Sequence, residues 1–238
     1  MTYADVRSIL VLGDSVSKGV VLHPHKKRYV FSKDGFIKQL TAKIKPDVFD
    51  FSKFGSTTSY GKDLLQKKLS ELEPDLVLIE YGSNDCDYHW DEVAENPFSR
   101  HMPNLSLTHY IENMASMVSV IRAGGRIPIL TNLHPLDGRR YFNWFTKNDI
   151  ARQKSTLLWL KRVDHIYWWQ EMYSYALERT AAALGVVVIN IRNAFLRQKD
   201  YTEYLCEDGI HPNEAGHDLI RQTFLDTMTG SRAAVLCK

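Results

Sequence analysis

The residue near the start of the chain with the clearest chemical potential is Ser15, in the sequence Gly13-Asp14-Ser15. It follows residues 9–12, a run that is apolar on both faces and therefore predicts a buried parallel strand. In open α/β sheets the ligand lies beyond the carboxyl ends of the strands, so this hydroxyl is expected at the active edge. Glycine, aspartate and serine also suit an ordinary turn or a helix cap, so this stretch alone does not establish an active site.

A second group of reactive residues lies near the other end of the chain, where Asp208 precedes His211 by three positions. In a turn, this spacing places a carboxylate beside a histidine ring nitrogen, where it fixes the tautomer and stabilises the imidazolium ion. Such a histidine would take the proton of Ser15 during attack, because a neutral hydroxyl is a weak nucleophile. In isolation Asp208 is typical of a turn and His211 of a capping or surface residue, but the serine motif favours the catalytic interpretation.

The sequence also offers hydrogen-bond donors for the negative charge that develops on a carbonyl oxygen during acyl transfer. Gly55 and Asn84 each follow a predicted strand. The backbone N–H groups of Ser15 and Gly55, together with the Asn84 amide, would form a three-donor oxyanion hole. One such donor is worth about 2.7–4 kcal/mol in other enzymes. Asp85, directly after Asn84, is interpreted only as part of the turn.

Five apolar runs of strand character alternate with segments of helical periodicity. The predicted strands cover residues 9–12, 48–51, 76–81, 127–132 and 186–191. The predicted helices cover residues 36–44, 64–72, 107–121, 163–184 and 212–228. The last of these helices is predicted to begin with Pro212. This alternation is typical of an α/β fold with a parallel sheet and right-handed crossovers. No linker, repeat or shift in composition divides the chain, so residues 1–238 are predicted to form a single domain.

Two long connections, residues 86–104 and 135–162, follow predicted strands and are expected as loops at the active edge of the sheet. Aromatic side chains are concentrated in residues 141–175. Part of this set recurs at helical intervals and is assigned to the core. The aromatic residues in 141–159 fit equally well a surface that stacks on a sugar, a shelter for an acyl chain, core packing or a dimer contact.

Composition and charge argue against several classes of protein. Thirty basic and 28 acidic residues leave a net charge of +2, which gives no electrostatic basis for binding nucleic acid or an anionic membrane. No apolar run approaches the roughly 20 residues needed to cross a bilayer, and the first residues lack a signal segment, so we expect a cytoplasmic protein. The sequence leaves the oligomeric state open, and a homo-oligomer is compatible with it.

Metal and disulfide sites are not expected. The three cysteines are far apart and form no Cys-x-x-Cys pair. Cys86 is interpreted as a small buried residue rather than a nucleophile. His23 and His25 lie in residues 20–33 without a nearby third ligand, which favours a solvated loop over a metal site.

Four stretches of the chain together resemble the blocks of the SGNH, or GDSL-type, serine esterase (acylhydrolase) family. Residues 13–15 resemble its first block, Gly55 the glycine of its second, residues 82–85 its third and residues 208–212 its last. Order and spacing agree over nearly the whole chain, although Gly55 alone carries the second block. The resemblance implies a flavodoxin-like three-layer α/β/α sandwich with a five-stranded parallel sheet, and ester hydrolysis without a metal or other cofactor.

The residues and the resemblance together predict a serine-dependent ester hydrolase. Ser15, Asp208 and His211 are the predicted catalytic triad, and Ser15, Gly55 and Asn84 the predicted oxyanion hole. The expected substrate is a small-molecule or carbohydrate ester that loses a short acyl group such as acetyl. The alternatives are a lysophospholipase or thioesterase-type acylhydrolase, a catalytically silent carbohydrate-binding domain, and a metallophosphoesterase.

Overall fold

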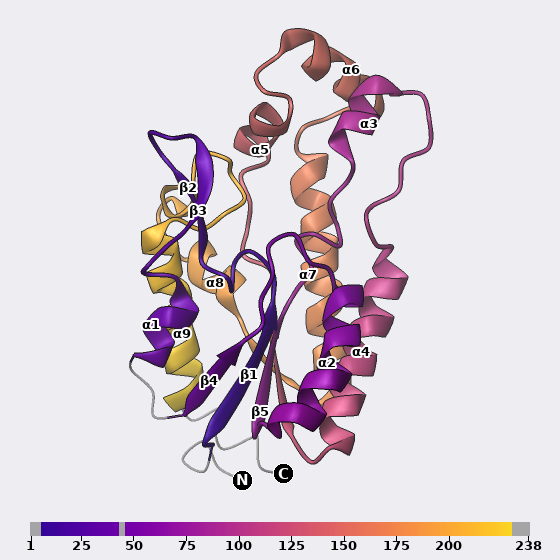
Figure 1. Ribbon diagram of the computed structural model, residues 1–238. Coiled ribbons are helices and arrows are strands. Elements are labelled where there is room, and N and C mark those ends of the chain that lie inside the picture. Colours follow the sequence, from indigo (N-terminus) through magenta and orange to yellow (C-terminus); the bar gives the residue numbers. More distant parts are fainter. Residues whose placement is uncertain (1–5, 43–45, 230–238) are drawn as a thin grey trace.

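A five-stranded parallel sheet forms the centre of the computed structural model, which describes residues 6–42 and 46–229 (Figure 1). Its strands are β1 (Ser8–Gly13), β4 (Asp47–Asp50), β5 (Leu76–Glu80), β6 (Ile127–Thr131) and β7 (Val187–Ile189). They lie in the order β4-β1-β5-β6-β7, and each neighbouring pair is parallel. This is the flavodoxin-like order, whose switch point lies between β1 and β5. The predicted fold class is confirmed.

Helices cover both faces of the sheet and complete a three-layer sandwich (Figure 1). One layer contains α2 (Thr58–Leu72), α4 (Leu107–Ala123) and α7 (His165–Leu184), and the other contains α1 (Phe36–Thr41), α8 (Ile191–Leu196) and α9 (Glu214–Thr229). Among the helices of the described chain, none combines the length and the apolar character needed to cross a membrane.

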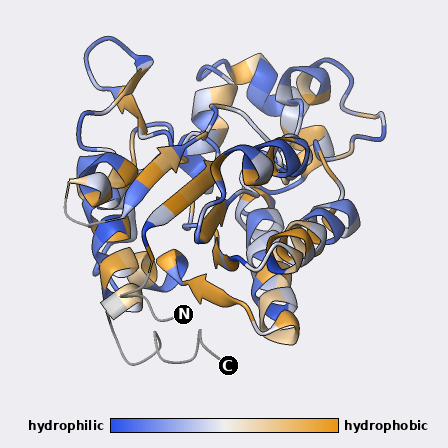
Figure 2. Cartoon of the chain, turned by 60° about the horizontal axis from the view of Figure 1, so that its bottom comes forward, coloured by the Kyte–Doolittle hydropathy of each residue, from blue (hydrophilic) through white to orange (hydrophobic). Residues whose placement is uncertain are grey.

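The side chains of β1 explain why its sequence is continuously apolar. Leu10 and Leu12 pack against the layer of α4 and α7, whereas Ile9 and Val11 pack against the layer of α1 and α9. All four are at most 2% exposed. In Figure 2 the strands are hydrophobic and the flanking helices turn hydrophobic sides toward them. The sheet is therefore the common wall of two cores, as expected for parallel strands covered on both faces.

A further group of elements lies beyond the carboxyl ends of the strands, at the top of Figure 1. It consists of the hairpin β2 (Val20–His23) and β3 (Arg28–Phe31), the helices α3 (Trp90–Glu95), α5 (Gly138–Phe145) and α6 (Ile150–Leu160), and a 3₁₀ helix (Tyr201–Tyr204). Buried side chains of α3, α5 and α6, among them Trp90, Phe142 and Leu160, form a small core of their own. This group builds the walls around the predicted site.

Two predictions about these walls are wrong. Residues 20–33 form an antiparallel hairpin instead of a solvated loop, because Val21 and Leu22 find a buried apolar surface beside Cys206. The connections 86–104 and 135–162 contain α3, α5 and α6 rather than loops alone. The last two helices begin at side-chain caps, which satisfy backbone N–H groups at their first turns.

The boundaries of the last elements also differ from the prediction. Strand β7 covers only Val187–Ile189, and α8 begins at Ile191, inside the predicted strand. Helix α9 begins at Glu214 rather than Pro212, because Pro212 pairs with Leu205 in an isolated β-bridge. Residue 44, the end of the first predicted helix, lies outside the described residues.

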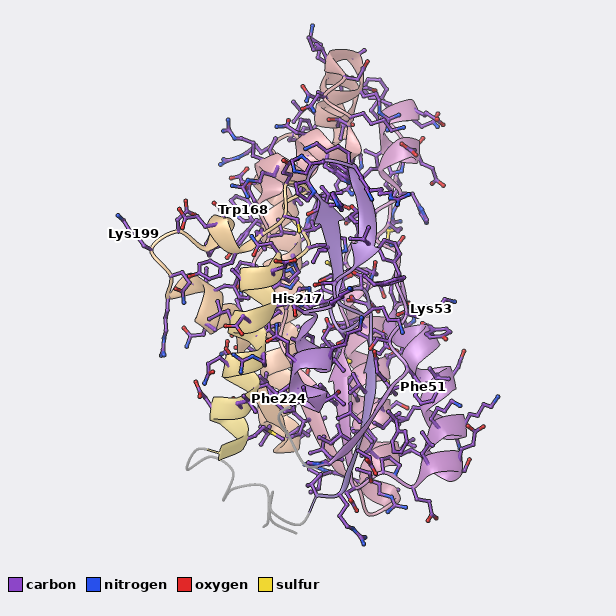
Figure 3. The ribbon with its side chains drawn as sticks, turned by 60° about the vertical axis from the view of Figure 1, so that its left-hand side comes forward. Phe51, Lys53, Trp168, Lys199, His217 and Phe224 are labelled. Atoms are coloured by element: carbon purple, nitrogen blue, oxygen red, sulfur yellow. The ribbon has the colours of Figure 1, made fainter. Side chains whose placement is uncertain are left out.

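A buried histidine of α9 makes the free energy of unfolding depend on pH. His217, labelled on α9 in Figure 3, is fully buried. It stacks on Phe36 of α1, with ring centroids 6.3 Å apart. Burial lowers the pKa of His217 from 6.5 to about 4, because the charged ring is costly in the core. As pH falls from 6.5 toward 4, the unfolded chain therefore binds a proton that the folded protein does not, and the free energy of unfolding drops by about 3 kcal/mol.

We expect the variant His217→Phe, which keeps a ring against Phe36, to lose less stability in acid than the wild type. Urea unfolding at pH 7 and pH 5 gives the loss for each protein, so a general packing effect of the larger ring cancels in the comparison. The control is His25→Phe, a change at an exposed position. Equal losses in the wild type and His217→Phe would contradict the prediction.

Candidate active site

Ser15, Asp208 and His211 meet at the carboxyl edge of the sheet. Ser15 lies in the turn after β1, and the other two lie in the loop before α9. His211 Nε2 is 3.0 Å from Ser15 Oγ, and His211 Nδ1 is 2.7 Å from Asp208 Oδ2. The structure thus joins residues from both ends of the chain in one row of hydrogen bonds. A row of this kind allows a histidine to take a proton from a serine hydroxyl.

The loop that carries Asp208 is fixed by its own backbone. Asp208 Oδ1 accepts hydrogen bonds from the N–H groups of Ile210 and His211, both at 3.1 Å. Gly209 has φ +77°, and a Cβ atom there would lie 2.6 Å from the carbonyl oxygen of Asp137, so the turn requires glycine. Burial raises the pKa of Asp208, but hydrogen bonds from His211 and the backbone together outweigh it and hold the pKa below its usual value. The carboxylate is therefore ionised at neutral pH.

Two aromatic rings enclose the imidazole of His211. The ring of Tyr29, from β3, lies 4.8 Å from it, and the ring of Phe54 lies 6.0 Å away and nearly parallel, at 14°. Neither residue was predicted as part of the site. Tyr29 had a signal in the sequence, because two short β-branched and aromatic runs flank a polar turn, which is typical of a hairpin. The imidazole of His211 is thus in contact with two aromatic rings and is itself buried.

The predicted oxyanion donors lie beside this row. Asn84 Nδ2 donates to Asp14 Oδ2 at 2.9 Å and to the carbonyl oxygen of Ser56 at 3.1 Å. Within the described residues, the backbone N–H groups of Ser15 and Gly55 donate to no protein acceptor. Gly55 has φ +72° and no atom within 4 Å of the position of a Cβ. The N–H groups of Ser15 and Gly55 are therefore free to bind a ligand, whereas the amide of Asn84 is hydrogen-bonded to Asp14 and Ser56.

Asp85, next to Asn84, has a structural partner. It is fully buried and accepts a hydrogen bond at 3.0 Å from the N–H group of Thr58, the first residue of α2. Burial raises the pKa of Asp85 to about 6. Asp85 therefore ties the loop after β5 to the start of α2.

A pocket of about 230 Å³ opens beside Ser15 and His211. Six aromatic residues form part of its wall (Tyr29, Phe54, Tyr88, Trp90, Tyr141 and Trp169), and the polar side chains of Asp87 and Gln170 also line it. A more open groove of about 820 Å³ runs outward along α3 and α5 and shares Trp90 and Tyr141 with the pocket. The site thus has a small inner compartment and a larger outer one.

The aromatic residues of the segment 141–175 divide between core, pocket and surface. Tyr173 is buried, whereas Tyr141 and Trp169 line the inner pocket. Trp168 is 52% exposed on the outer side of α7 (Figure 3). The adjacent residues Trp168 and Trp169 of α7 therefore face solvent and the inner pocket, respectively.

Asp87 gives the inner pocket a carboxyl group. Its Oδ1 accepts a hydrogen bond from Trp90 Nε1 at 2.8 Å, and its Oδ2 accepts one from the Tyr141 hydroxyl at 2.6 Å. Burial raises the pKa of Asp87, and these hydrogen bonds oppose that effect. Asp87 forms no ion pair with a basic side chain in the part of the chain that the structure describes. Its position after β5 was not singled out from the sequence.

The structure also places Cys86 and the histidine pair His23 and His25. Cys86 is buried, and burial raises the pKa of its thiol, as expected for a small packed residue rather than a nucleophile. His23 and His25 lie at the hairpin turn. Across residues 6–42 and 46–229, no group of three or more His, Cys, Asp or Glu side chains is arranged to hold a metal ion.

An open parallel sheet with a serine, a histidine and an aspartate joined at its switch point defines a hydrolase built on a three-layer α/β/α sandwich. Residues 11–219 match the GDSL-like Lipase/Acylhydrolase family. The chain belongs to this family and is a GDSL-type esterase or acylhydrolase. The family resemblance predicted from the four sequence blocks is confirmed.

Individual relatives agree with this assignment. Esterase TesA of Pseudomonas aeruginosa is 26% identical over 164 residues, which cover 65% of this chain and 70% of the relative. The crystal structure of a lipase/acylhydrolase from Enterococcus faecalis has a TM-score of 0.64 and 20% identity, covering 92% of this chain and 93% of that one. Axe2, an acetylxylan esterase from Geobacillus stearothermophilus, has a TM-score of 0.66 and 17% identity, covering 94% of both chains. At these identities the two structures establish a common fold.

Proposed function

We propose that the protein hydrolyses carboxylic esters with Ser15 as nucleophile, His211 as general base and acid, and Asp208 as the group that orients His211. The observation that carries the proposal is the row of hydrogen bonds from Ser15 through His211 to the buried Asp208. With Asp208 on Nδ1, the free electron pair of Nε2 faces the serine hydroxyl. Ser15 Oγ attacks the ester carbonyl carbon while Nε2 takes its proton.

The tetrahedral intermediate places a negative charge on the former carbonyl oxygen. The N–H groups of Ser15 and Gly55 would hold this oxygen without losing another partner. Asn84 would donate one amide hydrogen to Asp14 and turn the other from the neutral carbonyl of Ser56 to the oxyanion, which is the stronger acceptor. Stabilisation by fixed donors of this kind lowers the barrier to acyl transfer.

Collapse of the intermediate breaks the bond to the alcohol, which leaves with the proton from His211. The acyl group remains on Ser15 as an ester. A water molecule then attacks this ester while His211 takes the proton of the water, and the second intermediate releases the acid and restores the Ser15 hydroxyl. No group beyond these residues and water is needed to balance either half of the reaction.

The inner pocket favours a short acyl group on a polar, carbohydrate-like alcohol. A hydrocarbon chain in this pocket would leave the Asp87 carboxyl group without water and without a new partner, which is costly. A sugar ring stacks on aromatic faces and donates hydroxyl hydrogens to a carboxylate, and this wall offers both partners. Axe2, which shares the fold, is an acetylxylan esterase.

The decisive experiment compares p-nitrophenyl esters from acetate to palmitate, followed by acetylated xylo-oligosaccharides. We expect kcat/KM to be highest for acetate and to fall steeply with chain length, and we expect acetate release from the oligosaccharides. A preference for long chains would overturn the short-acyl assignment and favour a lysophospholipase or thioesterase-type enzyme. Hydrolysis of no ester by the folded protein would contradict the proposed function.

The variant Asp87→Asn tests whether Asp87 binds the sugar part of the substrate rather than the acyl group. The amide keeps the size of Asp87, but it removes the negative charge, so one charge-assisted hydrogen bond to a sugar hydroxyl is lost. We expect kcat/KM for an acetylated oligosaccharide to fall about 10-fold or more, from a loss of about 1.5–3 kcal/mol. For p-nitrophenyl acetate, which has no hydroxyl to offer, we expect little change. An equal loss on both substrates would show that Asp87 only supports the wall.

A further inference from the structure

Two carboxyl groups that take no part in the proposed proton transfers lie beside the turn of Ser15. Asp14 follows β1, and Glu80 is the last residue of the neighbouring strand β5, in register with Gly13. Asp14 is fully buried and Glu80 is only 3% exposed. A Cβ atom at Gly13 would lie 3.0 Å from Glu80 Oε2 and 2.5 Å from Ser17 Oγ, so glycine leaves the space in which these groups meet.

Glu80 holds the turn that carries Ser15. Its Oε2 atom accepts hydrogen bonds from the N–H groups of Asp14 and Ser17, at 3.3 and 3.2 Å, and from the Ser17 hydroxyl at 2.9 Å. These donors flank Ser15 on both sides in the sequence. With three donors on Oε2, the remaining atom Oε1 is the place for a proton, and the Glu80 carboxyl group interacts through charge with that of Asp14.

Asp14 connects this turn to the Asn84 amide. Its Oδ1 atom accepts the N–H group of Val16 at 2.8 Å, and its Oδ2 atom accepts Asn84 Nδ2 at 2.9 Å. Asp14 is the acceptor in both hydrogen bonds, and both are therefore strongest when its carboxyl group carries no proton. Glu80, by contrast, can donate to Asp14 only when it is protonated. The pattern of donors and acceptors therefore assigns different protonation states to the two neighbours.

Within residues 6–42 and 46–229, no basic side chain forms an ion pair with Asp14 or Glu80. Lys18, the nearest lysine in the sequence, lies 4.0 Å from Asp50 and not beside either buried carboxyl. Of the charge interactions of Asp14 in the described chain, the one with His211 is favourable. The other titratable groups that interact with Asp14 or Glu80 through charge are neutral or acidic: Tyr81, Asp85, Cys86 and Tyr110. Burial raises the pKa of both carboxyl groups, to about 6 for Asp14 and well above the usual value for Glu80.

We propose that Asp14 and Glu80 share one proton at neutral pH, carried by Glu80, and that this pair positions the Ser15 turn and the Asn84 amide for catalysis. The inference rests on the proposed function, since it assigns a task to Ser15 and Asn84. Protonated Glu80 donates to Asp14, and anionic Asp14 then fixes one amide hydrogen of Asn84. Removal of the proton leaves two buried anions that repel each other, so the turn and the amide lose their relative placement. Both residues are positioning residues, because neither reaches the substrate.

Glu80→Gln and Glu80→Ala test the pair. Glutamine reproduces protonated glutamate, since its carbonyl oxygen accepts from Ser17 and its amide donates to Asp14. We expect Glu80→Gln to keep kcat within a small factor of the wild type at pH 7 and to lose the alkaline decline that deprotonation of the pair causes in the wild type. We expect Glu80→Ala to lower kcat about 100-fold, as for loss of an oxyanion donor, with little change in KM. A Glu80→Gln variant as inactive as Glu80→Ala, or one with the wild-type alkaline decline, would overturn the proposal.

A readout without substrate separates this proposal from the proposed function. Because their pKa values are raised in the folded protein, these carboxyl groups make the free energy of unfolding fall as pH rises above the usual carboxyl range. Thermal unfolding between pH 5 and pH 9 should therefore show a smaller decline for Glu80→Gln than for the wild type. Equal declines would refute the shared proton even if esters are hydrolysed. A smaller decline in a protein that hydrolyses no ester would retain the shared proton but refute its positioning role together with the proposed function.

Discussion

Replacement of Ser15 by alanine is expected to lower kcat for p-nitrophenyl acetate by about 10⁴–10⁶-fold, since the attacking atom is removed and His211 has no group to activate. The fold should be unaffected. The Ser15 hydroxyl is hydrogen-bonded to His211, and the turn around it is held by Glu80 and by backbone contacts. Circular dichroism and thermal unfolding of the variant should match those of the wild type.

Covalent labelling makes this prediction specific to one atom. A serine-directed phosphonate should modify the wild type once, on Ser15, and should leave Ser15→Ala unmodified in intact-mass measurements. The matched control is Ser70→Ala, at an exposed position of α2, which should retain both turnover and labelling. Turnover of the wild-type order in Ser15→Ala would show that another group carries out the attack.

The features that the sequence predicts well are those with a local physical cause. An apolar run such as residues 9–12 has one stable environment, a strand covered on both faces, and its alternation with helical periodicity leaves few topologies. The Asp208–His211 contact is also local, because the four-residue turn from Asp208 to His211, with Gly209 at φ +77°, determines it. The topology of the sheet then brings the end of β1, with Ser15, to the loop before α9, with His211.

The features that the sequence does not reveal are built from residues distant in the chain. Tyr29, Phe54 and Asp87 come from three separate segments, and each is ordinary in its own segment. Helices α5 and α6 were missed because their apolar faces pack on α3 and α7 rather than on the sheet. Glu80 was an unusual residue at the end of an apolar strand, but only its contact with Asp14 gives that observation a meaning.

The carboxyl groups around Ser15 illustrate how environment sets function in this site. Asp208 is buried, yet hydrogen bonds from His211 and the backbone hold its pKa below the usual value. Glu80 is buried beside another acid, and its pKa is raised well above the usual value. The same chemical group is therefore an anion in one position and a hydrogen-bond donor in another. Differences of this kind distinguish the orienting residue of the proposed triad from the residues proposed to support the turn.

Asp208→Asn is expected to lower kcat by about 10⁴-fold while the protein remains folded. The asparagine oxygen can still accept the N–H groups of Ile210 and His211, so the turn persists. Its amide nitrogen, however, then faces His211 Nδ1 and donates to it. This reverses the tautomer, so that Nε2 carries a hydrogen and cannot accept the proton of Ser15. The asparagine variant therefore measures the effect of the tautomer alone. Asp208→Ala would also remove the two hydrogen bonds from the backbone.

The measurement is kcat and KM for p-nitrophenyl acetate at pH 7, where the wild-type Asp208 is ionised because hydrogen bonds from His211 and the backbone hold its pKa below the usual value. KM should change little, since Asp208 is behind His211 and does not line the pocket. Glu207→Gln is the matched control: it neutralises the adjacent carboxylate, which is exposed and paired with Lys27, and should leave kcat unchanged. If Asp208→Asn were nearly as active as the wild type, His211 would not depend on this carboxylate for its tautomer, and the triad would reduce to a serine–histidine pair. A loss of the expected size with unchanged KM would instead locate the contribution of Asp208 in the transition state.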